Sequence, residues 1–171
     1  MSTTDAYFLV PSGPGLAQLF ETDGTAASTR RIGIASFPVD PAMLTTAGSN
    51  LFFVDETTGD LWVTDGKFLG TEDLTSGSGV TADHLTAVGQ MLFFVNDADH
   101  TLWQSDGTVA GTQQVAVVNT LSAEDLTAVG GTLFFVDAGT GDLWTLTSNG
   151  SAQDVGNFGT IGNLTAVGSE L

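Results

Sequence analysis

The chain has 171 residues with no cysteine, and its 20 acidic residues outnumber the 3 basic ones to give a formal net charge of −17. A surface this acidic repels phosphate backbones and anionic membranes, which argues against nucleic acid as a partner, and the lack of cysteine excludes disulfides, thiol catalysis and thiolate metal sites. Hydrophobic residues make up 42%, and no apolar run reaches membrane-spanning length, so the composition predicts one folded domain over residues 1–171 without membrane insertion.

The first predicted strand covers residues 6–10, Ala-Tyr-Phe-Leu-Val, and a second covers residues 18–22 and continues into Asp23-Gly24-Thr25. The five residues before the first strand contain no basic region and no long apolar stretch, so they lack the pattern of a secretory signal peptide. Both opening strands match the middle of a pattern that recurs along the chain.

Three complete copies of that pattern follow, beginning at Leu44, Leu85 and Leu126, which are 41 residues apart. Each copy reads Leu-Thr-x-x-Gly, then a Leu-Phe-Phe-Val strand, then Leu-Trp. The tryptophans of the three copies are also 41 residues apart: Trp62, Trp103 and Trp144. A period near 41 is typical of a propeller blade made of four short strands.

The two ends of the chain supply the parts of a fourth copy. Residues 164–168, Leu-Thr-Ala-Val-Gly, are only the opening of a copy, and the first strands supply what this opening lacks, with Phe20 in the tryptophan place. Pairing the C-terminal strand with the N-terminal strands would remove two unpaired sheet edges. The sequence therefore predicts an all-β fold, a four-bladed β-propeller closed in this way. The alternative is half a ring, in which two chains form a larger propeller by exchanging ends.

Within a copy, the spacing predicts four antiparallel strands. The Leu-Thr-Ala-Val strand has small residues that suit the crowded inner edge, and the Phe-Phe pair, such as Phe52 and Phe53, points to both faces of its strand. Both faces are then apolar, as expected for a sheet packed between two neighbours. Asp65-Gly66 and Asp106-Gly107 are hairpin signals, and residues 113–118 are expected to form an outer strand.

The segment Thr101 to Thr112, Thr-Leu-Trp-Gln-Ser-Asp-Gly-Thr-Val-Ala-Gly-Thr, resembles the bacterial ELWxxDGT-type repeat family. The match is good from Asp60 to Thr71, where Lys67 replaces the motif threonine, while the glutamate before Leu-Trp is absent from every copy. This family is found in large secreted or surface bacterial proteins. The resemblance therefore implies a propeller-like fold and an extracellular or cell-surface location, and it implies no particular ligand.

The sequence offers little for catalysis. Its two histidines, His84 and His100, do not recur between copies, and no nucleophile-elbow pattern is present. Carboxylates are abundant, but nothing singles out a pair for acid–base hydrolysis. We predict that the protein is not an enzyme.

Acidic residues recur in the turns that follow the Leu-Phe-Phe-Val strands. Carboxylates and turn carbonyls are the oxygen ligands that Ca²⁺ prefers. The candidate metal ligands are Asp55, Asp60, Asp97, Asp99, Asp137 and Asp142. The turns lack the alternating Asp pattern of an EF-hand, and Asp and Gly also form tight turns without metal, which is the interpretation we favour.

A tryptophan beside Ser/Thr-Asp-Gly is also an arrangement that a multivalent lectin would use, because the ring stacks on a sugar while Asp bonds its hydroxyls. The candidate ligand-binding residues are Trp62, Trp103, Trp144, Asp65 and Asp106. The competing interpretation, which we favour for the rings, is that these tryptophans pack between blades and that the Asp side chains hold the hairpin turns.

We therefore expect a non-catalytic binding module, lectin-like or adhesive, that carries repeated sites and recognises a glycan or a protein surface. It needs no cofactor, and Ca²⁺ is the one candidate metal. The alternatives are a structural or protein-interaction ring without a small ligand, and a calcium-dependent protein that uses the acidic turns. The expected assembly is a monomer or an end-exchanged homodimer.

Overall fold

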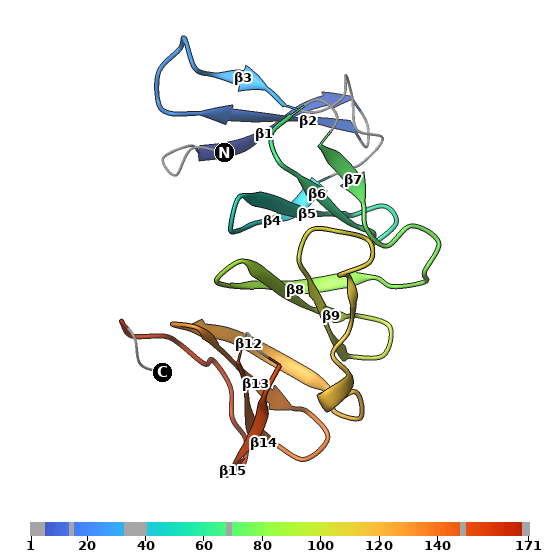
Figure 1. The fold of residues 1–171 in the computed structure, drawn as a ribbon, viewed down its shortest axis with the longest axis vertical. Helices are drawn as coiled ribbons and strands as arrows, with labels where there is room; N and C mark the ends of the chain where they lie inside the picture. Colours follow the sequence, from blue (N-terminus) through green and yellow to red (C-terminus); the bar gives the residue numbers. More distant parts are fainter. Residues whose placement is uncertain (1–5, 14–15, 33–40, 68–69, 148–149, 169–171) are drawn as a thin grey trace.

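Four small antiparallel sheets follow one another along the chain and lie one after another along the longest axis of the molecule (Figure 1). The fold is that of a computed structural model, which describes residues 6–13, 16–32, 41–67, 70–147 and 150–168. Within these ranges, no helix has the length and apolar character needed to span a bilayer. Each sheet corresponds to one copy of the repeat and is called a blade below.

Strand order within each blade follows the sequence. Blade 1 contains β1 (Ala6–Gly13), β2 (Leu16–Thr22) and β3 (Arg30–Arg31). Blade 2 contains β4 (Pro41–Ala47), β5 (Asn50–Asp55), β6 (Leu61–Thr64) and β7 (Thr71–Asp73). Blade 3 contains β8 (Ala82–Val88), β9 (Met91–Asn96), β10 (Thr101–Ser105), β11 (Gln113–Gln114) and the 3₁₀ turn η1 (Ala116–Val118). Blade 4 contains β12 (Ala123–Val129), β13 (Thr132–Asp137), β14 (Asp142–Thr147) and β15 (Ala152–Asn157).

The hairpin between the first two strands of blades 2 to 4 is set by a glycine. In blade 2, Ala47 pairs with Asn50, and the two-residue turn between them opens on Gly48 with φ +59°. Gly89 (φ +65°) and Gly130 (φ +59°) repeat this geometry in blades 3 and 4. A side chain with a β-carbon rarely adopts this backbone conformation, which explains why Gly ends the Leu-Thr-x-x-Gly pattern.

The Phe pair of the second strand joins each blade to both of its neighbours, as predicted. Phe52 packs in one apolar cluster with Phe94 of blade 3, while Phe53 packs in another with Leu19 of blade 1. Phe93 is directed to the other side of blade 3 and packs with Phe135 of blade 4. The core therefore consists of three clusters between successive blades, and the five phenylalanine rings named here are each less than 2% exposed.

Two details differ from the sequence prediction. The expected outer strand over residues 113–118 is a strand only at Gln113–Gln114, and it then turns into η1, which buries Val118 in the cluster between blades 3 and 4. The Asp-Gly pairs do not form two-residue hairpin turns, because β10 ends at Ser105 and β11 begins at Gln113. Asp106 and Gly107 open a longer loop, which the hydrogen bonds described below hold closed.

The four blades form an arc with the two ends of the chain far apart (Figure 1). Among the described strands β1 pairs only with β2, so the predicted pairing of the C-terminal strand with the N-terminal strands is not part of this structure. Residues 164–167 lie beside blade 4 instead, where the Thr127 hydroxyl donates to the carbonyl of Leu164 at 3.1 Å. The same bond joins Thr86 to Leu126 at 3.4 Å, so the last segment lies where the inner strand of a next blade would begin.

Candidate functional site: the groove between adjacent blades

The recurring Asp-Gly loop is held by its own side chains. The Asp106 carboxylate accepts the backbone N–H and the hydroxyl of Thr108, at 2.9 and 2.7 Å. In blade 2 the Asp65 carboxylate accepts the backbone N–H of Lys67 at 2.9 Å and its ammonium at 2.7 Å, and this ion pair lowers the pKa of Asp65. Both predicted binding residues therefore already stabilise a turn, and their role toward a ligand stays a prediction.

The motif glycine at the end of this loop leaves space for that carboxylate. A β-carbon on Gly70 or Gly111 would overlap the carboxylate of Asp65 or Asp106. Blade 1 has Ser28 at this place, and its hydroxyl donates to the Asp23 carboxylate instead. That bond, together with those from Thr25, lowers the pKa of Asp23. The repeated Asp-Gly-x-x-x-Gly/Ser-Thr spacing is thus explained by the loop itself.

The three predicted binding tryptophans, Trp62, Trp103 and Trp144, are half-buried and pack against the clusters between blades. Trp62 is stacked on Phe53 with ring centroids 6.3 Å apart, and Trp103 lies 6.1 Å from Phe94. Phe20 takes the same place in blade 1 and is stacked on Phe8 at 5.4 Å. The recurring ring therefore has a packing role, as the competing interpretation predicted, and a role in binding sugar stays a prediction.

Two predicted metal ligands are buried and hold the backbone together. Asp137 is 4% exposed and accepts the N–H groups of Ser122 and Gly139, at 2.9 and 3.2 Å, and the hydroxyl of Thr140 at 2.8 Å. Asp55, 3% exposed, accepts equivalent bonds from the turn that follows it. Blade 3 has Asn96 at this position, which accepts the N–H of Thr81 at 3.0 Å. The uncharged Asn96 side chain therefore makes the same kind of hydrogen bond in blade 3 as Asp137 makes in blade 4.

The other predicted metal ligands are dispersed over the same turns. The Asp99 carboxylate accepts bonds from Asn96 at 2.8 Å and from the hydroxyl of Thr101 at 2.7 Å; burial raises its pKa, but these bonds outweigh burial and the net pKa is lowered. Asp97 is exposed, whereas Asp60 and Asp142 are half-buried. Over the part of the chain that the structure describes, no three His, Asp or Glu side chains are grouped to hold a metal ion. Calcium binding therefore rests on the sequence pattern alone.

Replacing Asp137 tests this structural role. Because Asn96 fills the equivalent position, we expect Asp137→Asn to lower the free energy of unfolding by about 1 kcal/mol or less at pH 7, and Asp137→Ala by about 1–3 kcal/mol, since alanine leaves buried N–H groups unpaired. Urea unfolding measures both values. An Asn variant as unstable as the Ala variant would contradict the assignment.

The difference in the free energy of unfolding between the wild type and Asp137→Asn depends on pH. Burial raises the pKa of Asp137, but the hydrogen bonds from Ser122 and Thr140 outweigh it and hold the pKa below its usual range. The native state therefore binds this proton more weakly than the unfolded chain, whose Asp pKa is about 3.9. The stabilisation is present above that pH and is lost as the pH falls through the native pKa. We expect the gap between wild type and Asp137→Asn to shrink at acid pH.

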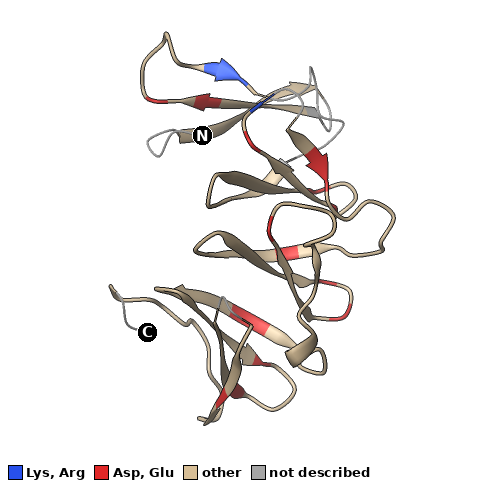
Figure 2. Ribbon diagram, in the orientation of Figure 1, with Lys and Arg blue, Asp and Glu red and all other residues tan. Residues whose placement is uncertain are grey.

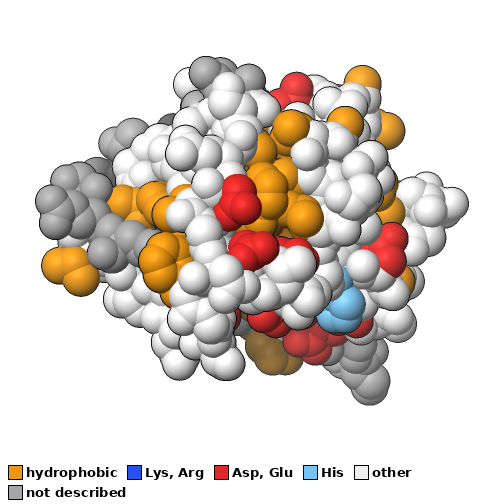
Figure 3. All heavy atoms as spheres, turned by 90° about the horizontal axis from the view of Figure 1, so that it is seen from below, with side chains coloured by type: hydrophobic (Ala, Val, Ile, Leu, Met, Phe, Trp, Pro, Cys, Tyr) orange, Lys and Arg blue, Asp and Glu red, His pale blue; other side chains and the backbone are white. Residues whose placement is uncertain are grey.

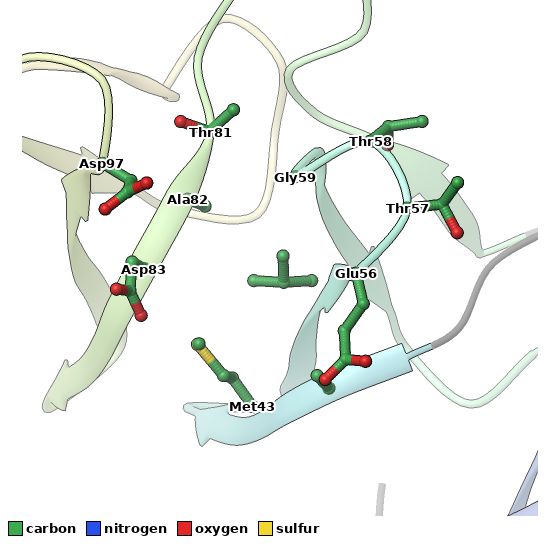
Figure 4. A pocket seen from close by; sticks show the side chains of 11 residues that line it. Met43, Glu56, Thr57, Thr58, Gly59, Thr81, Ala82, Asp83 and Asp97 are labelled. Atoms are coloured by element: carbon green, nitrogen blue, oxygen red, sulfur yellow. The ribbon is translucent and has the colours of Figure 1, made fainter.

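A groove lies between blades 2 and 3, on the face that carries the turns after β5 and β9 (Figure 4). It has a volume of about 490 Å³ and is shallow and open. Glu56 lines it from blade 2, Asp83 lines it from blade 3, and Met43 lies between them in this view. Thr57 and Thr58 of the β5–β6 turn also line the groove, but their side chains point away from it in this view, so the groove combines an exposed apolar side chain with carboxylate groups.

A second groove of about 360 Å³ lies at the equivalent place beyond blade 4. Its lining includes Val136, Thr140 and Gly141, which occupy the repeat positions of Val54, Thr58 and Gly59 in the first groove. The groove therefore recurs at two equivalent places, between blades 2 and 3 and between blade 4 and the segment that follows it.

In blades 2 to 4 the residue before the inner-strand leucine lies in a bulge, and in blade 2 this residue, Met43, lines the groove. Met43, His84, Asp125 and Asn163 all have positive φ, between 51° and 59°. In blades 2 to 4 the pairing of the first two strands shifts at this point, as between Ala42 and Thr45. Bulges re-aim a side chain, and here they expose Met43 to 47%. These residues end the variable connectors between copies and were not among the binding residues predicted by name; the signal is a position that differs in every copy directly before an invariant leucine of the repeat.

Comparison with known proteins supports the fold only. No family model and no curated protein matches the chain. Among solved structures it is similar to a streptogramin B lyase (15% identity, TM-score 0.53, 88% of this chain and 54% of the other), to human WBSCR16 (10%, 0.55, 84% and 47%) and to BamB from Moraxella catarrhalis (17%, 0.54, 94% and 50%). The chain spans about half the length of these structures. The resemblance to the ELWxxDGT-type family is carried by the motif alone. The protein is an all-β chain of four blade-like sheets that match those of β-propeller proteins.

Proposed function

We propose that this chain is a non-catalytic binding module, lectin-like in chemistry, that takes neutral glycans in the groove between blades 2 and 3 and in the equivalent groove beyond blade 4. The observation that supports the proposal is the recurrence of the groove at equivalent repeat positions, because repeated shallow sites give a binding protein avidity. The carboxylates of Glu56 and Asp83 can bond sugar hydroxyls, and Met43 offers an apolar surface for a sugar ring.

The composition of the groove favours binding over catalysis. Its eleven lining residues contain no histidine, lysine, cysteine or serine, so they supply no nucleophile paired with a nitrogen base. The carboxylates Glu56, Asp83 and Asp97, together with the net charge of −17, disfavour sialylated and sulfated sugars. The resemblance to repeats of secreted and surface proteins supports an extracellular or cell-surface location.

A glycan array, followed by calorimetry with the best neutral sugar, tests the proposal. We expect Met43→Ala and Glu56→Gln each to weaken binding about tenfold, which corresponds to about 1.4 kcal/mol. The matched control is Trp62→Phe, because Phe20 shows that a phenyl ring fits this place in a blade. This control should bind as the wild type does.

The outcomes separate the hypotheses. If Trp62→Phe abolishes binding and the groove variants do not, the site is at the tryptophans and the groove assignment is wrong. If no glycan binds and the protein captures defined basic peptides, the protein-interaction alternative replaces the lectin-like one. Repeating the assay with EDTA tests the calcium prediction, since loss of binding would assign the acidic turns to a metal.

A further inference from the structure

The two ends of the arc expose side chains whose repeat equivalents in the other blades are buried. In blades 2, 3 and 4 the second Phe of the pair is 0% exposed against the preceding blade: Phe53, Phe94 and Phe135. The equivalent ring in blade 1 is Phe8, which is stacked on Phe20 in the same way and is 38% exposed. Val10 on the same strand is also 38% exposed. We call this surface, Phe8, Val10 and Phe20, the head face.

At the other end of the arc, apolar side chains that are buried in blades 3 and 4 also have an exposed counterpart. Val167 occupies the repeat position of Val88 and Val129, which are 1% and 8% exposed, yet it is 73% exposed itself. Phe158, at the start of the same segment, is 65% exposed. Seen from this end of the molecule, hydrophobic side chains gather across the surface with acidic side chains among them (Figure 3). We call residues 158–168 the tail segment.

The head face and the tail segment are complementary, because the tail segment carries the first strand of a blade and blade 1 carries the strands that follow it. In blades 2 to 4 the Leu-Thr-x-x strand pairs antiparallel with the Phe strand, for example Thr127 with Phe134 and Ala128 with Leu133. The tail segment carries the first of these strands in residues 164–167, and among the described strands β1 has a partner on one side only. Within one copy the two lie at opposite ends of the arc, so they do not meet (Figure 1).

We propose that the head face receives the tail segment of a second copy of this chain, and that two copies joined head to tail in both directions close into one ring of eight blades. The proposal extends the three interfaces between successive blades already present in the molecule. The register of the first two strands within blades 2 to 4 predicts that Thr165 of one copy lies opposite Tyr7 of the other and that Ala166 lies opposite Ala6. The inference is independent of the proposed glycan site.

The distribution of charge agrees with this pairing. Two of the three basic residues of the chain, Arg30 and Arg31, lie on β3 of blade 1, and the other blades are predominantly acidic (Figure 2). Arg30 forms an ion pair with Glu21 and remains exposed. Blade 1 is therefore the part of the surface where an acidic second copy meets positive charge. Because each copy carries −17, we also expect the pair to be more stable at high ionic strength.

Cysteine cross-linking tests the register, since the chain has no cysteine of its own. Directly opposed residues of an antiparallel pair lie about 4.5–5.5 Å apart between Cα atoms, within the range of a disulfide. Ala6→Cys and Ala166→Cys proteins, prepared separately and mixed under mild oxidation, should give a covalent heterodimer in large excess over either homodimer. Val117→Cys, on an exposed residue of η1, is the control that should not cross-link to either.

Sedimentation and native mass spectrometry of the wild type supply a second readout. At about 0.5 M salt, where repulsion is screened, we expect twice the chain mass of 17.6 kDa, and Val167→Asp and Phe8→Asp should each give monomers that stay folded by circular dichroism. A monomeric wild type at micromolar concentration, or an internal disulfide in a protein carrying both cysteines, would overturn the proposal. A ladder of larger species would also overturn the closed pair, because it shows head-to-tail contact without closure.

Discussion

Replacing Phe94 with alanine is expected to lower the free energy of unfolding by about 3–5 kcal/mol. This ring is 0% exposed and lies in the cluster that joins blades 2 and 3, with Trp103 at a centroid distance of 6.1 Å. Truncation removes the apolar contacts and leaves a cavity that rigid neighbouring strands cannot close. A loss of this size is a large part of the stability of a typical domain, so urea unfolding should show a strongly lowered midpoint.

Two controls locate the effect in the cluster. Val117→Ala lies in the same blade at a side chain that is 59% exposed, and we expect a change of about 0.5 kcal/mol or less. Phe94→Leu keeps most of the buried volume and should cost clearly less than the alanine variant. If Phe94→Ala behaved like Val117→Ala, the cluster between blades 2 and 3 would not hold the arc together, and the packing described above would be wrong.

Replacing Gly111 with alanine is the second large effect, with an expected loss of about 1–3 kcal/mol. A β-carbon at this position overlaps the Asp106 carboxylate, which must swing away and release the N–H and hydroxyl of Thr108. Release leaves the loop between β10 and β11 without its internal hydrogen bonds. Thermal and urea unfolding measure the loss.

The matched control is Gly131→Ala, because a β-carbon there meets no atom within 4 Å. We expect this variant to be unchanged or slightly more stable, since alanine restricts the unfolded chain. A double-mutant cycle adds a stricter test: in an Asp106→Ala background the Gly111→Ala change should cost much less, because the overlapping carboxylate is gone. Equal costs in both backgrounds would show that Gly111 is needed for another reason.

Much of the fold could be predicted because the repeat is strict in its apolar positions. The period of 41, the glycine after the inner strand and the paired phenylalanines each have one local physical cause, so strands, first hairpins and two-sided packing followed from the sequence. The outer strand of blade 3 was less predictable. Residues 113–118 read as a β-strand, but packing of Val118 into the cluster between blades favours a 3₁₀ turn.

The candidate site was predicted less well, because its residues belong to two blades. Glu56 and Asp83 are 27 positions apart in the sequence, and only the packing of blade 2 on blade 3 brings them to one groove. Met43 was missed because a methionine in a short apolar run gives no sign of a bulge with positive φ. Asp65 and Asp106 were singled out as binding residues, whereas local hydrogen bonds engage both in their loops.

The sequence by itself determined the all-β class, the number of repeats, the first three strands of blades 2 to 4 and the excess of acidic residues, because these depend on local spacing and composition. Only the tertiary structure decided three further features: the tryptophans pack between blades, the buried turn acids bond to backbone, and the blades are arranged in an arc. Local periodicity specifies one blade, whereas the surroundings of Trp62 and β1 depend on which blade packs opposite, and the bonds of Asp137 depend on how its turn folds back onto the segment before β12.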